Sequence, residues 1–227
     1  MTRSRVTLAL LALCALATAV DLLSLATGFG PGHTLAKPLL MPLLAAWAAL
    51  RGAPRLLSAA LACGWGGDVL LLSDADPAFL AGMASFAAGH VCYLVLFARV
   101  GRPHARAAVL APCYAVVLTA TVVLLWPGLP HQLRPPVAVY STLLTAMACT
   151  AAVRLGPVAG AGGLLFLLSD TLIATGVADW PQPPRPDLWI MLTYVAAQFL
   201  LVRGVLDGLG GRREPAAAYR EVRSTTP

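Results

Sequence analysis

Charged residues are scarce in this sequence, and their scarcity decides the class of protein. Only 11% of the residues are Asp, Glu, Lys or Arg, whereas 59% are hydrophobic and the mean hydropathy is +0.78. Soluble domains carry about 25% charged residues, so the composition excludes an ordinary globular protein. The net charge of +6 would indicate a nucleic-acid partner in a soluble protein. In a membrane protein the same charge is better explained by topology, and we expect no nucleic-acid partner.

Long polar segments are also missing. A spanning helix needs roughly 20 apolar residues, and only short polar connections separate the eight apolar stretches of the sequence. The expected spans are residues 6–27, 35–51, 54–72, 78–98, 104–126, 135–154, 157–177 and 187–207. Such connections leave no room for a soluble domain. The sequence therefore predicts an all-α, polytopic membrane bundle of eight transmembrane helices, with residues 1–207 as a single transmembrane domain.

Basic residues are nearly absent from one side of this expected bundle. If the spans alternate in direction, all but three of the sixteen Lys and Arg residues lie on the side of the two termini. The three on the opposite side are Lys37, Arg134 and Arg185. The positive-inside rule then places both termini in the cytoplasm and the protein in the cell (inner) membrane. Residues 208–227 are rich in Gly, Pro and charge, which predicts a disordered cytoplasmic tail.

The first span has a second interpretation. Arg3 and Arg5, the apolar run from Val6 and the small residues at 17–19 are also typical of a secretory signal that is cleaved. The apolar character continues through Leu25, which favours a retained helix.

Motifs for metal ions and disulfides are absent as well. All five cysteines fall within expected spans without a C-x-x-C pair, and we expect them to be small packing residues. The four histidines, at positions 33, 90, 104 and 131, offer no ligand spacing such as H-x3-H. The sequence therefore predicts neither a metal site nor a cofactor.

Two carboxyl groups stand out against this apolar background. Asp68 lies in LACGWGGDVLLL and Asp170 in GGLLFLLSDTLIA. An ionisable group at membrane depth costs about 3 kcal/mol, so it needs a partner, a wet cavity or a proton. One alternative is a buried pair that only locks the bundle, but buried ionic groups contribute little to stability. We therefore predict that Asp68 and Asp170 are catalytic.

Other polar residues are expected at a similar depth, in the half of the bundle away from the termini. Counted from the span ends, this group comprises Lys37, Asp21, His90, Tyr93, Tyr140, Tyr194 and Gln198. We predict that they line a substrate-binding pocket. Three alternatives stay open: Lys37 as an interfacial anchor, Asp21 as a structural carboxyl near Thr18 and Ser24, and the aromatic face of span 78–98 as a packing stripe.

Several motifs of the chain resemble the YhhN family of membrane proteins, which includes the animal lysoplasmalogenases. They are Lys37-Pro38-Leu39-Leu40-Met41-Pro42, Gly67-Asp68 followed by leucines, Phe86-x3-His90-x2-Tyr93, and Ser169-Asp170. The likeness covers roughly residues 35–205 and eight spans. Ala36 departs from the pattern, because the family often has a hydroxyl residue there. The resemblance implies cleavage of the vinyl ether bond of lysoplasmalogens, giving a fatty aldehyde and a glycerophospho-ethanolamine or -choline.

The chemistry of two carboxyls fits such a reaction. Protonation of the vinyl β-carbon creates an oxocarbenium ion that water captures, as in glycosidases, so one acid and one carboxylate are needed. We take Asp170, flanked by leucines, as the acid and Asp68, expected nearer the surface, as the ionised partner. Lys37 would attract the phosphate of a lysophospholipid substrate. His90 and Tyr93 would orient water or donate to the ether oxygen.

Two other functions use the same residues. Intramembrane carboxyls also form proton relays in transporters of small molecules, although Pro42 and Pro112 do not break corresponding helices in two halves. A non-catalytic lipid-binding or assembly subunit is the third possibility, and it would tolerate changes of both aspartates. The sequence does not decide the oligomeric state.

Overall fold

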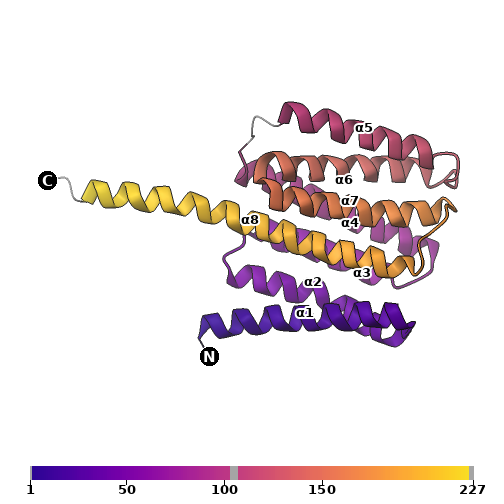
Figure 1. Cartoon of the computed structure of the whole chain (residues 1–227), viewed down its shortest axis with the longest axis horizontal. Helices are drawn as coiled ribbons and strands as arrows, with labels where there is room; N and C mark the ends of the chain where they lie inside the picture. The colour runs from indigo at the N-terminus through magenta and orange to yellow at the C-terminus, as the bar shows by residue number, and fades with distance from the viewer. Residues whose placement is uncertain (1, 103–106, 225–227) are drawn as a thin grey trace.

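The computed structural model describes residues 2–102 and 107–224, and these residues form eight α-helices (Figure 1). The helices are α1 (Arg3–Thr27), α2 (Gly30–Leu50), α3 (Arg55–Leu70), α4 (Asp76–Val100), α5 (Ala107–Leu125), α6 (Arg134–Leu155), α7 (Pro157–Val177) and α8 (Pro186–Ser224). The predicted all-α class is confirmed for the described residues. His104 and the first residues of the expected span 104–126 lie outside them.

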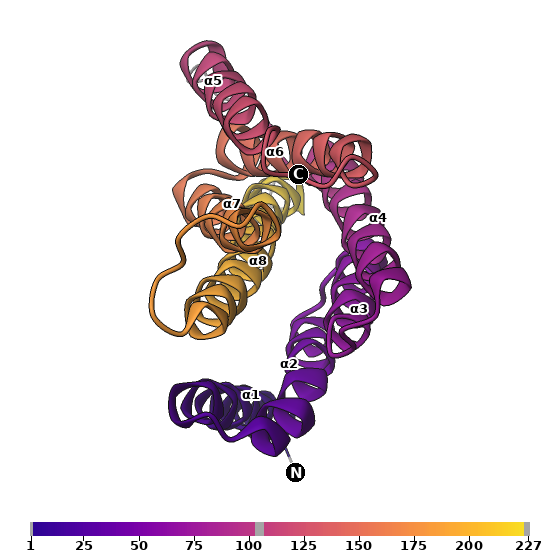
Figure 2. The same ribbon diagram turned by 90° about the vertical axis from the view of Figure 1, so that its right-hand side faces the viewer.

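The helices run alternately up and down one common axis, so α1 begins and α8 ends at the same end of the bundle (Figure 1). Seen end-on, α1, α2, α3, α4 and α6 follow an arc, and α7 and α8 lie on its inner side (Figure 2). Helix α8 packs mainly on α7 and also contacts α1, α2, α4 and α6, whereas α5 contacts only α6 and α7 among the main helix pairs. The arc and the α7–α8 pair therefore enclose the interior.

Six of the helices are long and apolar enough to cross a membrane: α1, α2, α4, α6, α7 and the segment Pro186–Gly210 of α8. The apolar part of α5, Val109–Leu125, is shorter, and α3 has 16 residues. Large apolar side chains also cover the outside of the bundle. Leu35, for example, is 74% exposed and Val116 is 68% exposed. Such a surface fits lipid rather than water, so the chain is a multi-pass membrane protein. Crossing by all eight helices stays a prediction.

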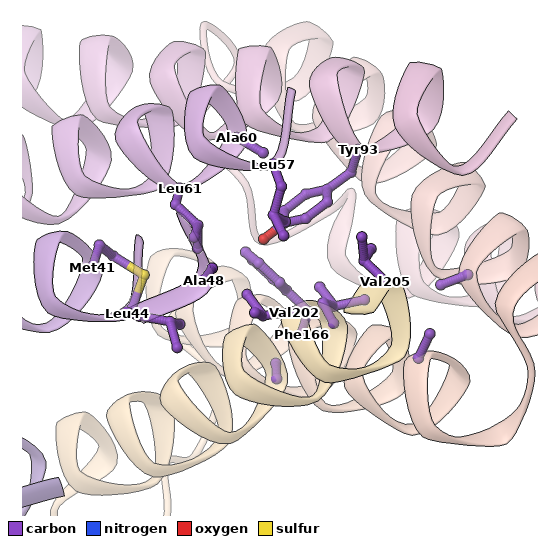
Figure 3. Packing of buried hydrophobic residues seen from close by; sticks show 14 of the residues in the cluster. Met41, Leu44, Ala48, Leu57, Ala60, Leu61, Tyr93, Phe166, Val202 and Val205 are labelled. Atoms are coloured by element: carbon purple, nitrogen blue, oxygen red, sulfur yellow. The ribbon is translucent and has the colours of Figure 1, made fainter. Parts of the chain in front are cut away.

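The main hydrophobic core joins α2, α3, α4, α6, α7 and α8 and reaches α1 at Cys14 (Figure 3). Leu44 of α2, Leu57 of α3 and Phe166 of α7 are almost completely buried in it. Val202 and Val205 of α8 close the core from the inner side of the arc. This packing holds together the helices that carry the polar side chains of the interior.

Helix α7 approaches both of its neighbours very closely because glycines face them. A Cβ atom at Gly163 would lie 2.7 Å from Cα of Ala148 in α6. A Cβ atom at Gly162 would lie 2.9 Å from the Leu201 nitrogen in α8. Small residues are the usual means of close helix approach in membranes. The position of α7, and with it that of Asp170, is therefore tightly determined.

Two helix boundaries differ from the sequence-based expectation. Helix α2 begins at Gly30 instead of residue 35, because Pro31 occupies the first turn, where proline is well tolerated. Helix α8 continues through Ser224, past the expected end of the span at 207. The assignment of residues 208–227 to a cytoplasmic tail outside a single domain stays a prediction.

Candidate active site

The polar side chains converge at the end of the bundle opposite to the chain termini. Asp68 lies in the last turn of α3, and Asp170 lies about two turns before the end of α7. Lys37, Tyr140 and Tyr194 lie about two turns after the starts of α2, α6 and α8. Because the helices alternate in direction, these positions are at one level. The predicted convergence in depth is confirmed.

A cavity of about 100 Å³ lies at this level, with room for several water molecules. Its lining is mostly apolar and comes from every helix from α2 to α8. The five charged or phenolic side chains that line it are Lys37, Asp68, Tyr140, Asp170 and Tyr194. Val117 of α5 also lines the cavity and is 49% exposed on the outside of the bundle. The cavity therefore reaches the lipid-facing surface beside α5.

Asp68 stands at the end of a hydrogen-bond chain that we call the Asp68 arm, formed by Asp68, Tyr194, Gln198 and Tyr93. The Tyr194 hydroxyl donates to Asp68 Oδ2 over 2.9 Å, and Gln198 Nε2 donates to the Tyr194 hydroxyl over 3.3 Å. The Tyr93 hydroxyl donates to Gln198 Oε1 over 2.6 Å. The arm therefore joins α3, α8 and α4 through four buried side chains.

Asp170 stands at the end of a second chain, the Asp170 arm, formed by Asp170, Tyr140 and His90. The Tyr140 hydroxyl donates to Asp170 Oδ2 through a short hydrogen bond. His90 Nε2 lies 3.1 Å from the same hydroxyl. The imidazole packs edge-on against Phe166, with 4.9 Å between ring centroids, and its Nδ1 is buried without a partner among the described residues. The Asp170 arm thus runs from α7 through α6 to α4.

The two carboxyls share the cavity, but no hydrogen bond joins them in the described part of the chain. Each carboxyl accepts its hydrogen bond from a different tyrosine instead. Asp68 is 2% exposed, whereas Asp170 is only half-buried. The sequence analysis expected Asp68 to lie nearer the surface, so the structure reverses the expected order of exposure. Of the leucines beside Asp170, Leu167 lines the cavity together with the carboxyl and Leu168 is 48% exposed, so these leucines do not bury Asp170.

Lys37 is placed beside Asp68 by a bond between α2 and α3. Pro42 has no N–H, so the Pro38 carbonyl one turn earlier loses its usual helical partner. The Trp65 indole N–H donates to that carbonyl over 2.9 Å. Lys37 adjoins Pro38, and Asp68 lies one turn after Trp65 on α3. The bond therefore holds the lysine and the carboxyl on neighbouring walls of the cavity.

Lys37 is buried, and among the described carboxylates none has an oxygen within 4.0 Å of its ammonium group. It lies close enough to Asp68 for its charge to act on that carboxyl. Since the side chain lines the cavity, the ammonium group is available to an anion there. The alternative of Lys37 as a purely interfacial anchor does not fit this burial.

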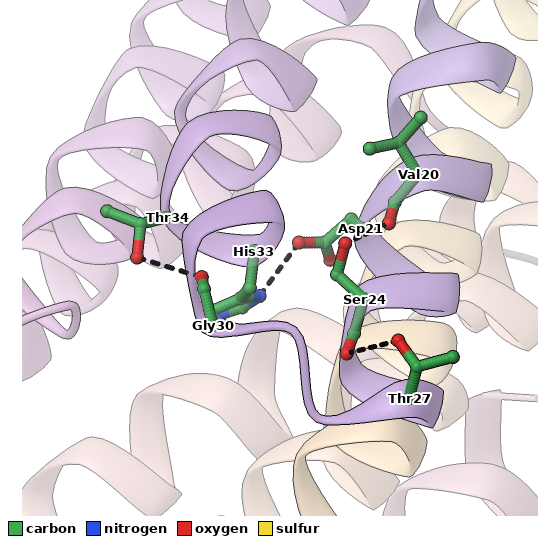
Figure 4. Close-up of polar contacts among 7 residues, drawn as sticks. All are labelled: Val20, Asp21, Ser24, Thr27, Gly30, His33 and Thr34. Atoms are coloured by element: carbon green, nitrogen blue, oxygen red, sulfur yellow. Dashed lines mark hydrogen bonds and ion pairs between the residues drawn. The ribbon is translucent and has the colours of Figure 1, made fainter.

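Asp21 lies away from the cavity lining and has a partner that the sequence did not suggest. His33 Nδ1 is 2.7 Å from Asp21 Oδ1, between α1 and α2 (Figure 4). Ser24 and Thr18 instead donate to carbonyls of their own helix. The other oxygen, Asp21 Oδ2, is buried and has no partner in the part of the chain that the structure describes. His33 was missed because residues 31–33 read as a connection, although the spacing of four from Lys37 puts both on one face of α2.

The predicted site residues thus fall into two layers. Five line the cavity: Lys37, Asp68, Tyr140, Asp170 and Tyr194. Four lie behind its wall: Asp21, His90, Tyr93 and Gln198. Direct contact of the second group with a substrate is not favoured by this placement. Within the described residues, no group of three or more His, Cys, Asp or Glu side chains is arranged to hold a metal ion.

Two carboxyls, a lysine and two tyrosines thus surround one cavity inside a helical membrane bundle. Comparison with known families identifies the class of protein. The YhhN family matches residues 32–205, which is most of the sequence, so the chain belongs to the YhhN family. The match includes the cavity residues of α2, α3, α4, α6, α7 and α8. The resemblance inferred from the motifs is therefore confirmed.

Curated relatives carry the name lysoplasmalogenase. The chain is 36% identical to lysoplasmalogenase TMEM86B of Homo sapiens over 162 residues, which are 68% of this chain and 65% of that protein. It is 34% identical to the protein of the same name from Rattus norvegicus, over 77% of this chain and 72% of the relative. The lysoplasmalogenase of Mycobacterium bovis is 33% identical, over 58% of this chain and 52% of the relative.

These matches leave part of each relative uncovered. The aligned part spans just under two thirds of the length of the human protein and 61% of that of its counterpart from Sus scrofa. No solved structure matches the chain.

Proposed function

We propose that the protein is a lysoplasmalogenase-like membrane hydrolase, which cleaves the vinyl ether bond of a lysophospholipid to a fatty aldehyde and a glycerophospho-ethanolamine or -choline. The observation that carries the proposal is the presence of Asp68 and Asp170 on one mostly apolar cavity that also holds the Lys37 ammonium group. The names of the relatives support it. No cofactor is needed for this chemistry.

The cavity suits each part of such a substrate. The apolar walls and the opening beside Val117 accept the hydrocarbon chain from the lipid. The Lys37 ammonium group lies at the same level and attracts the phosphate of the head group. The vinyl ether bond, which lies between the chain and the glycerol, then faces the two carboxyls. The substrate is thus oriented by its two unlike ends.

The reaction needs one carboxyl as acid and one as base. The acid adds its proton to the vinyl carbon β to the ether oxygen, and the π electrons form the new C–H bond, which leaves an oxocarbenium ion. Water attacks the carbon of this ion and gives a proton to the base, forming a hemiacetal. The base returns that proton to the glycerol oxygen as the C–O bond breaks. The hemiacetal hydroxyl reprotonates the acid, and the aldehyde leaves.

We also propose the topology that the charges indicate. All eight helices cross the cell (inner) membrane, with the short α3 packed between α2 and α4 and α5 packed against α6, and both termini lie in the cytoplasm. Support comes from the common end at which α1 begins and α8 ends and from the clustering of basic residues there (Figure 1). The cavity then opens in the outer half of the membrane. Cysteine labelling of the two ends in intact cells tests this orientation.

The test of the function is product analysis with purified protein and matched lysolipids that carry a vinyl ether, an alkyl ether or an acyl chain. Release of a fatty aldehyde from the vinyl ether form alone supports the proposal. Cleavage of the acyl form alone would identify a lysophospholipase instead. Proton-coupled uptake into liposomes without any aldehyde would identify the alternative, a transporter.

A further inference from the structure

We propose that the two hydrogen-bond arms behind the cavity divide the roles of the carboxyls. Gln198 keeps Asp68 as the carboxylate base, and His90, acting through Tyr140, is the positioning residue for a proton-bearing Asp170, the acid. That Asp170 uses its proton to cleave a vinyl ether rests on the proposed function. The protonation states of Asp68 and Asp170 do not depend on that function.

The direction of donation in the Asp68 arm is determined by the amide of Gln198. An amide donates only from its nitrogen and accepts only at its oxygen. The Tyr93 hydroxyl occupies Gln198 Oε1, so Nε2 is left to donate to the Tyr194 hydroxyl. Tyr194 must then use its single proton on Asp68 Oδ2. Asp68 Oδ2 is therefore a hydrogen-bond acceptor in this arrangement, which stabilises the carboxylate form.

Charge supports the same assignment. Lys37 acts electrostatically on Asp68, and the described residues provide no cation that acts on Asp170. In a medium of low dielectric, a buried ammonium group requires a countercharge nearby. An ionised Asp68 supplies it, and a neutral Asp170 avoids an uncompensated charge in the same cavity.

The Asp170 arm lacks such a fixed direction because it ends in an imidazole. His90 Nε2 donates to Tyr140 in one neutral tautomer and accepts from it in the other. Tyr140 can therefore donate to Asp170 or accept from it. The tautomer with its proton on Nε2 leaves Nδ1, which has no partner in the described residues, without a hydrogen, and Tyr140 then donates to Asp170 Oδ2 whether Oδ1 carries a proton or not. The imidazole is neutral in either case, since an imidazolium would leave a charged Nδ1–H buried without an acceptor.

The Asp170 arm also selects the oxygen that carries the proton. When Tyr140 donates to Oδ2, that oxygen acts as the carbonyl, and the proton belongs on Oδ1. The buried polar atoms without partners are Asp21 Oδ2, His90 Nδ1 and Gln182 Oε1 in the described residues. Oδ1 of Asp170 is not one of these buried atoms without partners, and the Asp170 side chain lines the cavity. The acidic proton therefore faces the space that a substrate would enter.

Chemical labelling tests the protonation states without any reference to turnover. A long-chain diazoacetate ester takes a proton from a carboxylic acid at its diazo carbon, after which the carboxylate displaces N₂ and forms an ester. A long-chain terminal epoxide is instead opened by a carboxylate oxygen, and water protonates the resulting alkoxide. We expect the diazo reagent to label Asp170 and the epoxide to label Asp68, as located by peptide mass spectrometry.

Three results of the labelling would overturn the proposal. They are the opposite assignment, reaction of both reagents at the same aspartate, and no reaction at either, since the last would mean that the carboxyls do not face the cavity. Asp68→Asn and Asp170→Asn serve as controls that each remove one label. A protein that labels as expected but releases no aldehyde would refute the proposed function and leave this assignment standing.

Two conservative variants test His90 as a positioning residue. His90→Gln puts an amide N–H where Nε2 donates to Tyr140, whereas His90→Asn is too short to reach it. We expect His90→Asn to lower kcat about 10–100-fold with KM within about twofold, and His90→Gln to stay within about fivefold of the wild-type kcat. Equal losses in both variants would mean that the imidazole itself transfers a proton. Wild-type rates in both would mean that His90 has no part in the site.

Discussion

Asp68 and Asp170 reach one cavity from α3 and α7, and each accepts a hydrogen bond from a tyrosine on another helix, α8 for Tyr194 and α6 for Tyr140. Behind the tyrosines the two arms differ, since one continues to an amide and the other to an imidazole. Because Tyr93 occupies Gln198 Oε1, the amide is left to donate to Tyr194, whereas the imidazole of His90 can donate or accept. On the proposed assignment, chemically identical carboxyls acquire different roles from residues that lie behind the cavity wall.

The surroundings of the two arms reinforce the difference. Asp68 is almost completely buried, has Lys37 as its countercharge and lies where the Trp65–Pro38 hydrogen bond ties α3 to α2. Asp170 is half-buried on a helix that glycines bring close to α6 and α8. These differences agree with the proposal that Asp68 keeps a constant charge. They also agree with Asp170 as the carboxyl that contacts the substrate.

The largest expected effect comes from removing either carboxyl. Asp68→Asn and Asp170→Asn should each lower kcat by about 100–10,000-fold, because each deletes one partner of the acid–base pair while preserving shape. Aldehyde release by purified variants measures the loss, and size-exclusion chromatography in detergent verifies folding. Near wild-type turnover in either variant would show that the arms do not serve a two-carboxyl reaction.

The tyrosines should give the next largest effect and separate the two arms. Tyr140→Phe and Tyr194→Phe should each lower kcat about 10–100-fold, because the carboxyl loses its donor and the residue behind it loses its acceptor. His90→Asn should add little to Tyr140→Phe, since His90 acts through that hydroxyl, but should add its full effect to Tyr194→Phe. A double-mutant cycle of kcat values measures both couplings. Full additivity in both pairs would contradict the separation of the arms.

Lys37 should matter mainly for substrate binding. Lys37→Met should raise KM for a vinyl ether lysophospholipid by roughly 10-fold or more, the equivalent of one hydrogen bond to a charged group. A matched alkenylglycerol without phosphate should show a much smaller increase in KM. An equal increase for both substrates would mean that Lys37 does not contact the phosphate and serves only as the countercharge of Asp68.

The far end of the Asp68 arm should give the smallest effect. Tyr93→Phe removes the donor to Gln198 Oε1 but leaves Gln198 Nε2 on Tyr194, so we expect kcat to fall by only about 2- to 5-fold, roughly the worth of one neutral hydrogen bond. Tyr114→Phe, a change of a buried tyrosine on α5 outside both arms, is the matched control. A loss in Tyr93→Phe as large as that in Tyr194→Phe would place Tyr93 in contact with the substrate.

Much of this arrangement could be predicted from the sequence, because apolar runs define helices and polar residues have a depth along them. The convergence of Lys37, Asp68 and Asp170 at one level follows from helix ends alone. Helix ends do not determine whether a side chain lines the cavity or lies behind its wall. His90 and Gln198 have the right depth but turn behind the cavity wall, since the rotation of α4 and α8 depends on packing with their neighbours. The Asp21–His33 pair was hidden for another reason: α2 begins one turn earlier than its apolar run.

The most direct test of the central claim, that Asp170 gives its proton to a vinyl carbon in this cavity, is turnover in heavy water. An acid that exchanges with solvent then delivers deuterium, so the aldehyde, trapped at once by reduction, should carry one deuterium on the carbon next to the carbonyl. Asp170→Asn should yield almost no labelled product. An aldehyde without deuterium at that carbon, or undiminished labelling in Asp170→Asn, would contradict the account.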